Sequence, residues 1–208
     1  MIEDGRPRLL IEDWLPVAEL GVESVRERAV VMDLPPLFGL HVWWARRPLV
    51  ASAGAILGSL LPAWSQELSD DFNDYEQLST PAAYRRWFLH LCGIWGDPIG
   101  AKRMLDAANA AGAKLKGNGY GYKQAYKNSP GVQDLQLLHD VLLHSWNGMP
   151  TLLDPTAGGG SIPYTAVRYR LCPVEWWVFG LSLGVGCRCE FGCGDGSGWG
   201  SELGHGVF

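Results

Sequence analysis

The stretch that decides the fold is Thr151-Leu152-Leu153-Asp154-Pro155-Thr156-Ala157-Gly158-Gly159-Gly160-Ser161-Ile162-Pro163. Its first four residues have the apolar character of a short buried strand, glycines follow at once, and a helical pattern comes next. Glycine has no Cβ, so the backbone can turn sharply after the strand and approach a ligand closely. This order of strand, turn and helix predicts the beginning of an α/β unit.

The same turn indicates a site for a small polar cofactor. Ser161 is predicted to cap the following helix and Pro163 to stand in its first turn, so that backbone amides point at whatever lies above the strand. No Gly-Lys-Ser/Thr follows, which excludes a P-loop, and the glycines depart from the dinucleotide spacing Gly-x-Gly-x-x-Gly. A simple turn between a strand and a helix is the alternative interpretation.

Upstream of this unit the chain is predicted to be mainly helical. The apolar spacing predicts a turn that leads into an amphipathic helix within 9–31, and helices over 49–61, 81–94, 98–113 and 132–144. We expect the polar face of the first helix to be solvated. The acidic stretch 65–77 is predicted to be a connecting loop rather than a metal site, because its carboxylates lack the spacing and the glycine of a calcium loop.

The composition changes abruptly at Cys172. Residues 172–208 are rich in glycine, contain no lysine and show no periodic apolar pattern. Such a tail is predicted to be irregular or disordered, and the change is typical of translation out of frame. The segment Cys187-Arg188-Cys189-Glu190-Phe191-Gly192-Cys193 offers three thiolates without a paired Cys-x-x-Cys, so we predict no metal site there.

The charge and hydropathy limit the class of protein. No apolar run is long enough to span a membrane and the first residues lack the character of a signal peptide, which predicts a cytoplasmic protein without membrane contact. The formal net charge is −5, with 17 Lys and Arg against 22 Asp and Glu. This balance argues against binding nucleic acid by bulk electrostatics, so a nucleic-acid face must be local.

One window is locally basic. Between Lys102 and Lys127 there are six Lys and Arg against the single acid Asp106, and tyrosines alternate with glycines. Lysines on such a loop can track phosphates while tyrosines stack on bases. The candidate nucleic-acid residues are Lys114, Lys116, Tyr120, Tyr122, Lys123 and Lys127. The alternative is a solvated surface loop whose tyrosines pack onto the core.

Two stretches resemble a known family. The run Asp-Pro-Thr-Ala-Gly-Gly-Gly-Ser over 154–161 resembles the Asp-Pro-Phe-x-Gly-x-Gly signature of amino-directed DNA methyltransferases. The run Pro-Pro-Leu-Phe-Gly-Leu-His-Val-Trp-Trp-Ala-Arg-Arg-Pro-Leu over 35–49 is similar to the N-terminal domain of the adenine-specific DNA methylases. With Leu-Ile-Glu-Asp-Trp-Leu-Pro over 10–16, the likeness extends roughly from residue 8 to residue 170.

The resemblance implies an S-adenosylmethionine-dependent DNA adenine methyltransferase whose glycine loop holds the methionine part of the cofactor. It also implies that the His-x-Trp-Trp-Ala-Arg-Arg-Pro segment lies beside the cofactor. Without the family, these tryptophans and arginines would be core and surface neighbours. The candidate cofactor-binding residues are Asp154, Pro155, Thr156, Ala157, Gly158, Gly159, Gly160, Ser161, His41, Trp43, Trp44, Arg46 and Arg47.

The fold class is thus predicted to be α/β. A mainly helical N-terminal region is followed by the truncated start of a Rossmann-like methyltransferase unit and by an irregular Gly-rich tail. The predicted segments are 1–64 with the methylase-associated stretch, 65–147 with helices and the basic loop, 148–171 with the strand, loop and helix, and 172–208.

The chain lacks the residues expected to perform the transfer. Methylases of this kind carry Asp/Asn-Pro-Pro followed by an aromatic residue, and no such tetrapeptide occurs among the 208 residues. Glu175 is the only candidate at the expected distance for the acid that binds the ribose. We therefore predict no catalytic residue, an incomplete and inactive N-terminal fragment, and DNA and a separately encoded subunit as partners. The alternatives are a non-catalytic DNA-binding or assembly module and an RNA or small-molecule methyltransferase.

Overall fold

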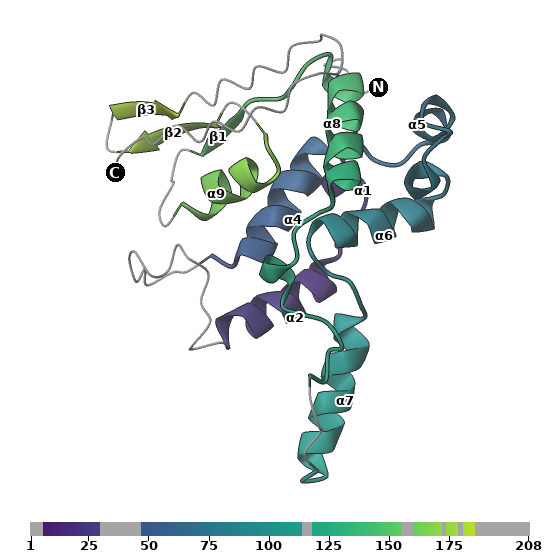
Figure 1. Cartoon of the computed structure of the whole chain (residues 1–208), viewed down its shortest axis with the longest axis vertical. Coiled ribbons are helices and arrows are strands. Elements are labelled where there is room, and N and C mark those ends of the chain that lie inside the picture. The colour runs from purple at the N-terminus through teal and green to yellow at the C-terminus, as the bar shows by residue number, and fades with distance from the viewer. Residues whose placement is uncertain are drawn as a thin grey trace.

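The structure is a computed structural model that describes residues 6–29, 47–113, 118–154 and 160–171, and the backbone of 174–178 and 181–185. Its described part is mainly helical, with short strands at the C-terminal side (Figure 1).

Helices α2 (Val17–Arg28) and α4 (Leu49–Leu60) form where the apolar spacing predicts them, and the short helix α1 (Leu10–Asp13) lies where a turn was predicted. The amide of Leu10 donates to the carbonyl of Leu61 at 2.8 Å, which ties α1 to the end of α4. Gly54 lets α2 approach α4 closely, because a Cβ there would lie 2.6 Å from a methyl carbon of Leu20. The small residues of α4 therefore serve helix packing.

The prediction of a loop over 65–77 is wrong in part. This stretch contains α5 (Gln66–Asp71) and most of the 3₁₀ turn η1 (Glu76–Leu78). The hydroxyl of Ser65 accepts from the amide of Leu68 at 3.1 Å, which caps α5, and the indole of Trp64 donates to the carbonyl of Leu78 at 2.8 Å. An N-cap and one buried leucine form a short helix despite the acidic composition.

The three helices predicted further along are confirmed. They are α6 (Pro81–Leu91), α7 (Pro98–Ala110) and α8 (Val132–Trp146). Thr80 and Asp97 cap α6 and α7 with their side chains, and a proline follows each cap. Proline is favoured at this position, where its missing amide hydrogen costs nothing. The free end of α7 extends away from the other helices (Figure 1).

A small sheet follows α8. Strand β1 (Leu152–Asp154) leads to α9 (Ser161–Arg168), and β2 (Val174–Val178) pairs with β1 in parallel, Leu153 opposite Glu175. β3 (Leu181–Val185) pairs with β2 in antiparallel fashion, which gives the order β1-β2-β3. The predicted strand and the predicted helix are confirmed, and the turn between them lies outside the described residues.

The sequence predicted an irregular tail, but part of the tail has regular structure. β2 and β3 both lie within 172–208. The sequence of β2 is Val-Glu-Trp-Trp-Val, which is rich in the β-branched and aromatic residues that favour strands, and it begins one residue after Pro173. Glu175 is the second residue of β2 rather than its last, so it does not stand at the carboxyl end where a ribose-binding acid is expected.

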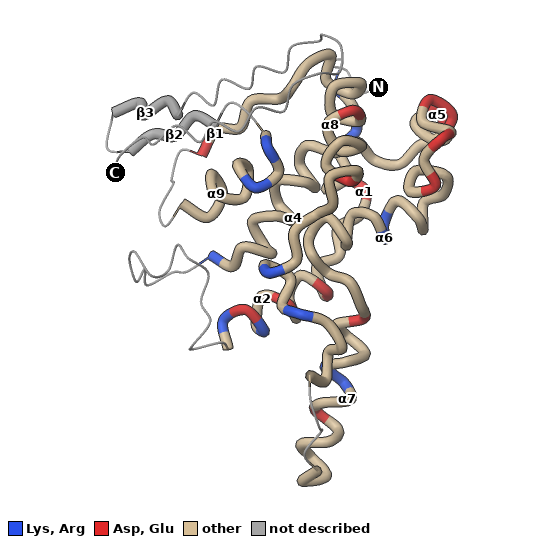
Figure 2. Tube along the Cα trace, in the orientation of Figure 1, with Lys and Arg blue, Asp and Glu red and all other residues tan. Residues whose placement is uncertain are grey.

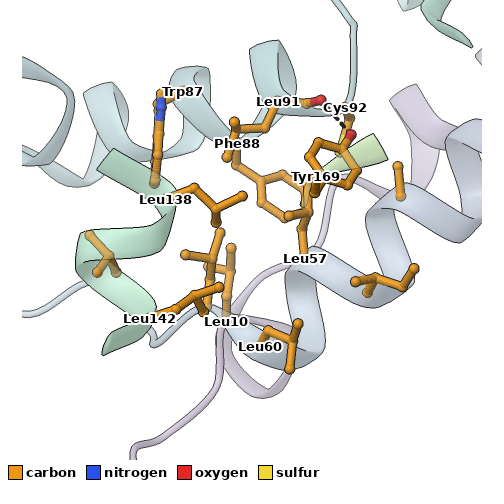
Figure 3. Close-up of a cluster of buried hydrophobic side chains, with 14 of the residues drawn as sticks. Leu10, Leu57, Leu60, Trp87, Phe88, Leu91, Cys92, Leu138, Leu142 and Tyr169 are labelled. Atoms are coloured by element: carbon orange, nitrogen blue, oxygen red, sulfur yellow. Dashed lines mark hydrogen bonds between the residues drawn. The ribbon is translucent and has the colours of Figure 1, made fainter. Parts of the chain in front are cut away.

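One hydrophobic core joins residues from Leu10 to Leu171 (Figure 3). Phe88 and Leu138 from α6 and α8 meet Leu57 of α4 in it. Tyr169, which follows α9, is buried there and its hydroxyl donates to the carbonyl of Leu91 at 2.6 Å. The end of α9 is thereby fixed to the helical part of the protein.

We expect Leu138→Ala to lower the free energy of unfolding by about 2–5 kcal/mol, because it leaves a cavity in this core. Leu143 on the same helix is 46% exposed, whereas Leu138 is fully buried. Leu143→Ala is the matched control and should cost less than about 1 kcal/mol. Denaturant unfolding followed by circular dichroism measures both. Equal losses in the two variants would contradict this placement of the core.

Candidate functional site

The candidate cofactor site begins at the end of β1. Asp154 is the last residue of this strand and its side chain is only 3% exposed. Gly160, immediately before α9, has a φ of 74°, which glycine adopts without strain. Pro155, Thr156, Ala157, Gly158 and Gly159 lie outside the described residues. The strand end and the helix start are thus placed, and the backbone between them stays a prediction.

The start of α9 differs in one detail from the expectation. Gly160 occupies the N-cap position and Ser161 is the first residue of the helix, so Ser161 does not cap it. The carbonyl of Ser161 accepts from the hydroxyl of Thr165 at 2.6 Å. Pro163 stands in the first turn as predicted. Helical amides in a first turn have no acceptor within the helix, so those of Ser161 and Ile162 need partners outside it.

Helix α9 connects the strands to the helical part. It packs against α4 and contacts both β1 and β2. The guanidinium of Arg168 donates to the carbonyl of Asn128. The imidazole of His139 lies 2.9 Å from the carbonyl of Tyr169. The β1-α9-β2 unit is therefore fixed to α4, to α8 and to the loop that precedes α8.

The second candidate stretch is mostly outside the described residues. His41, Trp43, Trp44 and Arg46 are not described, and their place beside the cofactor stays a prediction. Arg47 is exposed and lies two residues before α4. Since α4 packs against α9, the helix that follows this stretch contacts the helix that follows the glycine loop.

Two buried carboxylates were missed by the sequence analysis. Glu23 and Glu27 of α2 are 1% and 3% exposed, which contradicts the expectation that the polar face of this helix is solvated. Both follow Leu20 at helical spacing, three and seven residues later, and so continue its buried face. This spacing is the sequence signal for their burial, but the prediction of a buried face considered apolar residues only.

Each carboxylate has its own donors. Glu27 accepts from the amides of Leu49 and Val50 at 2.9 and 3.3 Å, so it caps the N-terminus of α4. Glu23 pairs with Arg26 at 3.0 Å and accepts from the hydroxyl of Tyr122 at 2.7 Å and the amide of Ala125 at 3.1 Å. The carboxylates thus join α2 to α4 and to the loop that precedes α8.

This burial shifts two titrations. Burial raises the pKa of Glu27, and the two amide hydrogen bonds oppose that rise in part. Burial, followed by the hydrogen bond to the Glu23 carboxylate, raises the pKa of the Tyr122 phenol. Tyr122 therefore stays protonated and remains a donor to Glu23 at physiological pH.

The described candidate nucleic-acid residues are of two kinds, exposed lysines and partly enclosed tyrosines. Lys114 and Lys116 lie outside the described residues. Lys123 and Lys127 are exposed, on and beside the 3₁₀ turn η2 (Ala125–Lys127). The tyrosines are more enclosed: the guanidinium of Arg26 lies 4.1 Å from the ring centre of Tyr120 and 4.9 Å from that of Tyr122. Tyr122 thus packs onto α2, as the structural alternative for this loop expects.

The comparisons with known proteins give one match. Residues 14–88 match the family described as "Protein of unknown function (DUF1156)", about a third of the chain. No curated protein and no solved structure matches. The matched range contains α2, α4, α5 and most of α6 together with Glu23 and Glu27, and it ends before the glycine loop.

Two further searches concern the described residues alone. None of the helices described is long and apolar enough to cross a bilayer. The described residues also contain no group of three or more His, Cys, Asp or Glu that could hold a metal ion. Cys187, Cys189 and Cys193 lie outside them.

Glu27 makes stability depend on pH in a defined direction. Its pKa is raised above the ordinary 4.5, so the folded protein holds this proton more tightly than the unfolded chain does. Its contribution to stability is complete below that value and is lost as the pH rises through the folded pKa. We expect the unfolding free energy to fall more steeply above this point in the wild type than in Glu27→Gln.

Glu19→Gln is the control, because it removes a less buried carboxylate from the same helix. Urea unfolding at several pH values would measure the slopes. The assignment fails if Glu27→Gln and the wild type have the same slope, and it also fails if Glu19→Gln flattens the slope as much.

Proposed function

We propose that this chain binds S-adenosylmethionine and forms the donor-binding part of a DNA adenine methyltransferase. The observation that carries the proposal is the β1-α9-β2 unit, in which a buried aspartate ends β1 and a glycine with positive φ opens α9. Ligands of parallel sheets bind at the carboxyl ends of the strands, which is where this aspartate stands. The resemblance of 154–161 to the methyltransferase signature selects the cofactor.

The residues present suit the methionine part of the cofactor. That part carries an ammonium and a carboxylate. The carboxylate of Asp154 can accept hydrogen bonds from the ammonium, while amides in the first turn of α9 favour the carboxylate through the helix dipole. A Cβ at Gly160 would meet no atom within 4 Å, so there is open space beside this turn. The bound cofactor would supply an activated methyl group on a sulfonium.

The proposal extends the unit to the start of a Rossmann-like domain. Methyl transfer to adenine also requires the base to be rotated out of the stack and its amino group held in line with the sulfonium. Since the 208 residues contain no Asp/Asn-Pro-Pro-aromatic tetrapeptide, we propose that the acceptor-binding residues come from outside them. A separately encoded subunit would provide them.

Calorimetric titration of the chain with S-adenosylmethionine tests the proposal. We expect saturable binding at one site. Asp154→Asn keeps the shape of the side chain and removes its charge, so it should weaken binding by at least about tenfold. Asp140→Asn on α8 is the matched control and should leave the affinity unchanged. Thermal melts of both variants would establish that they fold.

The outcomes separate the competing functions. Absence of binding by the folded wild type would contradict the proposal and favour a non-catalytic DNA-binding or assembly module. Equal weakening by the two variants would move the site away from β1. Cofactor binding by a chain that shows no preference for DNA over RNA would instead favour an RNA or small-molecule methyltransferase.

A further inference from the structure

The charges of this acidic chain are segregated. The segments 47–64, 118–133 and 160–171 contain Arg47, Lys123, Lys127, Arg168 and Arg170 and no Asp or Glu, whereas 65–78 contains five acids and no Lys or Arg. Figure 2 shows acidic positions gathered at α5, and basic positions at the start of α4, near α9 and, together with acidic ones, on α2. The net charge of −5 therefore conceals a basic region.

The contacts of α2 bring several of these cations into one neighbourhood. Glu27 binds the amides of Leu49 and Val50, which places the end of α2 against the start of α4. Arg28 directly follows Glu27, and Arg47 lies two residues before Leu49. Both arginines are exposed.

The loop before α8 and the end of α9 join the same neighbourhood. Arg26 donates to the carbonyls of Tyr122 and Lys123, and η2 contacts both α2 and α4. Arg168 donates to the carbonyl of Asn128, the residue after Lys127. We call Arg28, Arg47, Lys123, Lys127 and Arg168 the basic face.

The nearby acids do not cancel this charge at the surface. Glu23 and Glu27 are the acids in the last two turns of α2, and both are buried. Arg26 pairs with Glu23 in the interior, with 10% of its side chain exposed. The last two turns of α2 therefore add the exposed Arg28, and no exposed carboxylate, to this neighbourhood.

We propose that the basic face binds DNA through its phosphates. A surface on which Lys and Arg from several segments gather suits a polyanion, and release of condensed counterions drives such binding. Tyr126 is partly exposed beside Lys127, and its ring could add contacts to sugars or unstacked bases. Tyr120 and Tyr122 are left out, because the guanidinium of Arg26 already lies over both rings.

This inference rests on the proposed function to the extent that DNA is the acceptor, and it deepens that function by naming the surface. It changes the sequence-based expectation in two ways. It adds Arg28, Arg47 and Arg168, which lie outside the window from Lys102 to Lys127. It also leaves out Tyr120 and Tyr122, which the sequence analysis named as candidates.

Fluorescence anisotropy with a labelled DNA duplex, without cofactor, tests the inference on the full chain. The variant is Arg47→Ala/Lys123→Ala/Lys127→Ala. The control is Arg86→Ala/Lys102→Ala/Arg103→Ala, which removes three exposed cations from α6 and α7 and causes the same change in net charge. Thermal melts of both would show that they remain folded.

We expect the face variant to bind at least about tenfold more weakly at low salt and to reduce the slope of log affinity against log salt by about 2–3, since each lost phosphate contact removes about 0.9. The control should retain the affinity and slope of the wild type. Equal weakening by both variants, absence of DNA binding by the folded wild type, or binding to anionic lipid vesicles in place of DNA would overturn the inference. Since no cofactor is present, failure here is distinct from failure to bind S-adenosylmethionine.

Discussion

The described structure depends on two carboxylates that α2 carries into the interior. Burying a carboxylate is costly unless donors surround it. Glu27 finds them in the first amides of α4, and Glu23 finds them in Arg26, Tyr122 and Ala125. These donors belong to segments far apart in the sequence. Providing hydrogen-bond donors to both acids therefore fixes α2 against the start of α4 and against the loop before α8. Loss of either contact would leave a buried carboxylate short of donors.

These hydrogen bonds also help to position the candidate site, because α4 connects α2 to the strands and helix of that site. α4 packs against α9, and α9 lies between the two parallel strands in sequence and contacts both. At the far end of α9, Tyr169 enters the core and donates to the carbonyl of Leu91. A three-residue strand such as β1 would be marginal by itself, because few contacts stabilise it. Its position relative to α9 is therefore set by the helical part, which forms most of the core.

The sequence predicted elements wherever hydrophobic spacing and chain-breaking residues agreed. Examples are the Ala-rich helix α4, the helices α6 and α7, in which a proline follows the N-cap residue, and the strand before the glycines. It did not predict α5, because the acidic composition of this stretch indicated a loop. The helix nevertheless forms behind a single N-cap residue, Ser65. It misjudged Glu23 and Glu27 because residue type suggests exposure, while Val17 and Val25 on the same helix are 68% and 64% exposed. Only the partners of an acid, which tertiary structure supplies, decide whether it is buried.

The same contact bears on the stretch that resembles the methylases. Residues 30–46 stand in sequence between α2 and α4, outside the described residues. The Glu27 carboxylate at the end of α2 accepts from the amide of Leu49 at the start of α4, so the described positions on either side of this stretch are held against one another. Bringing two such points of a chain together costs conformational entropy, and the hydrogen bonds of Glu27 offset part of that cost. The interaction that caps α4 thus also fixes the distance that residues 30–46 span, and a buried acid serves where an apolar residue could have packed but could not have accepted the amides.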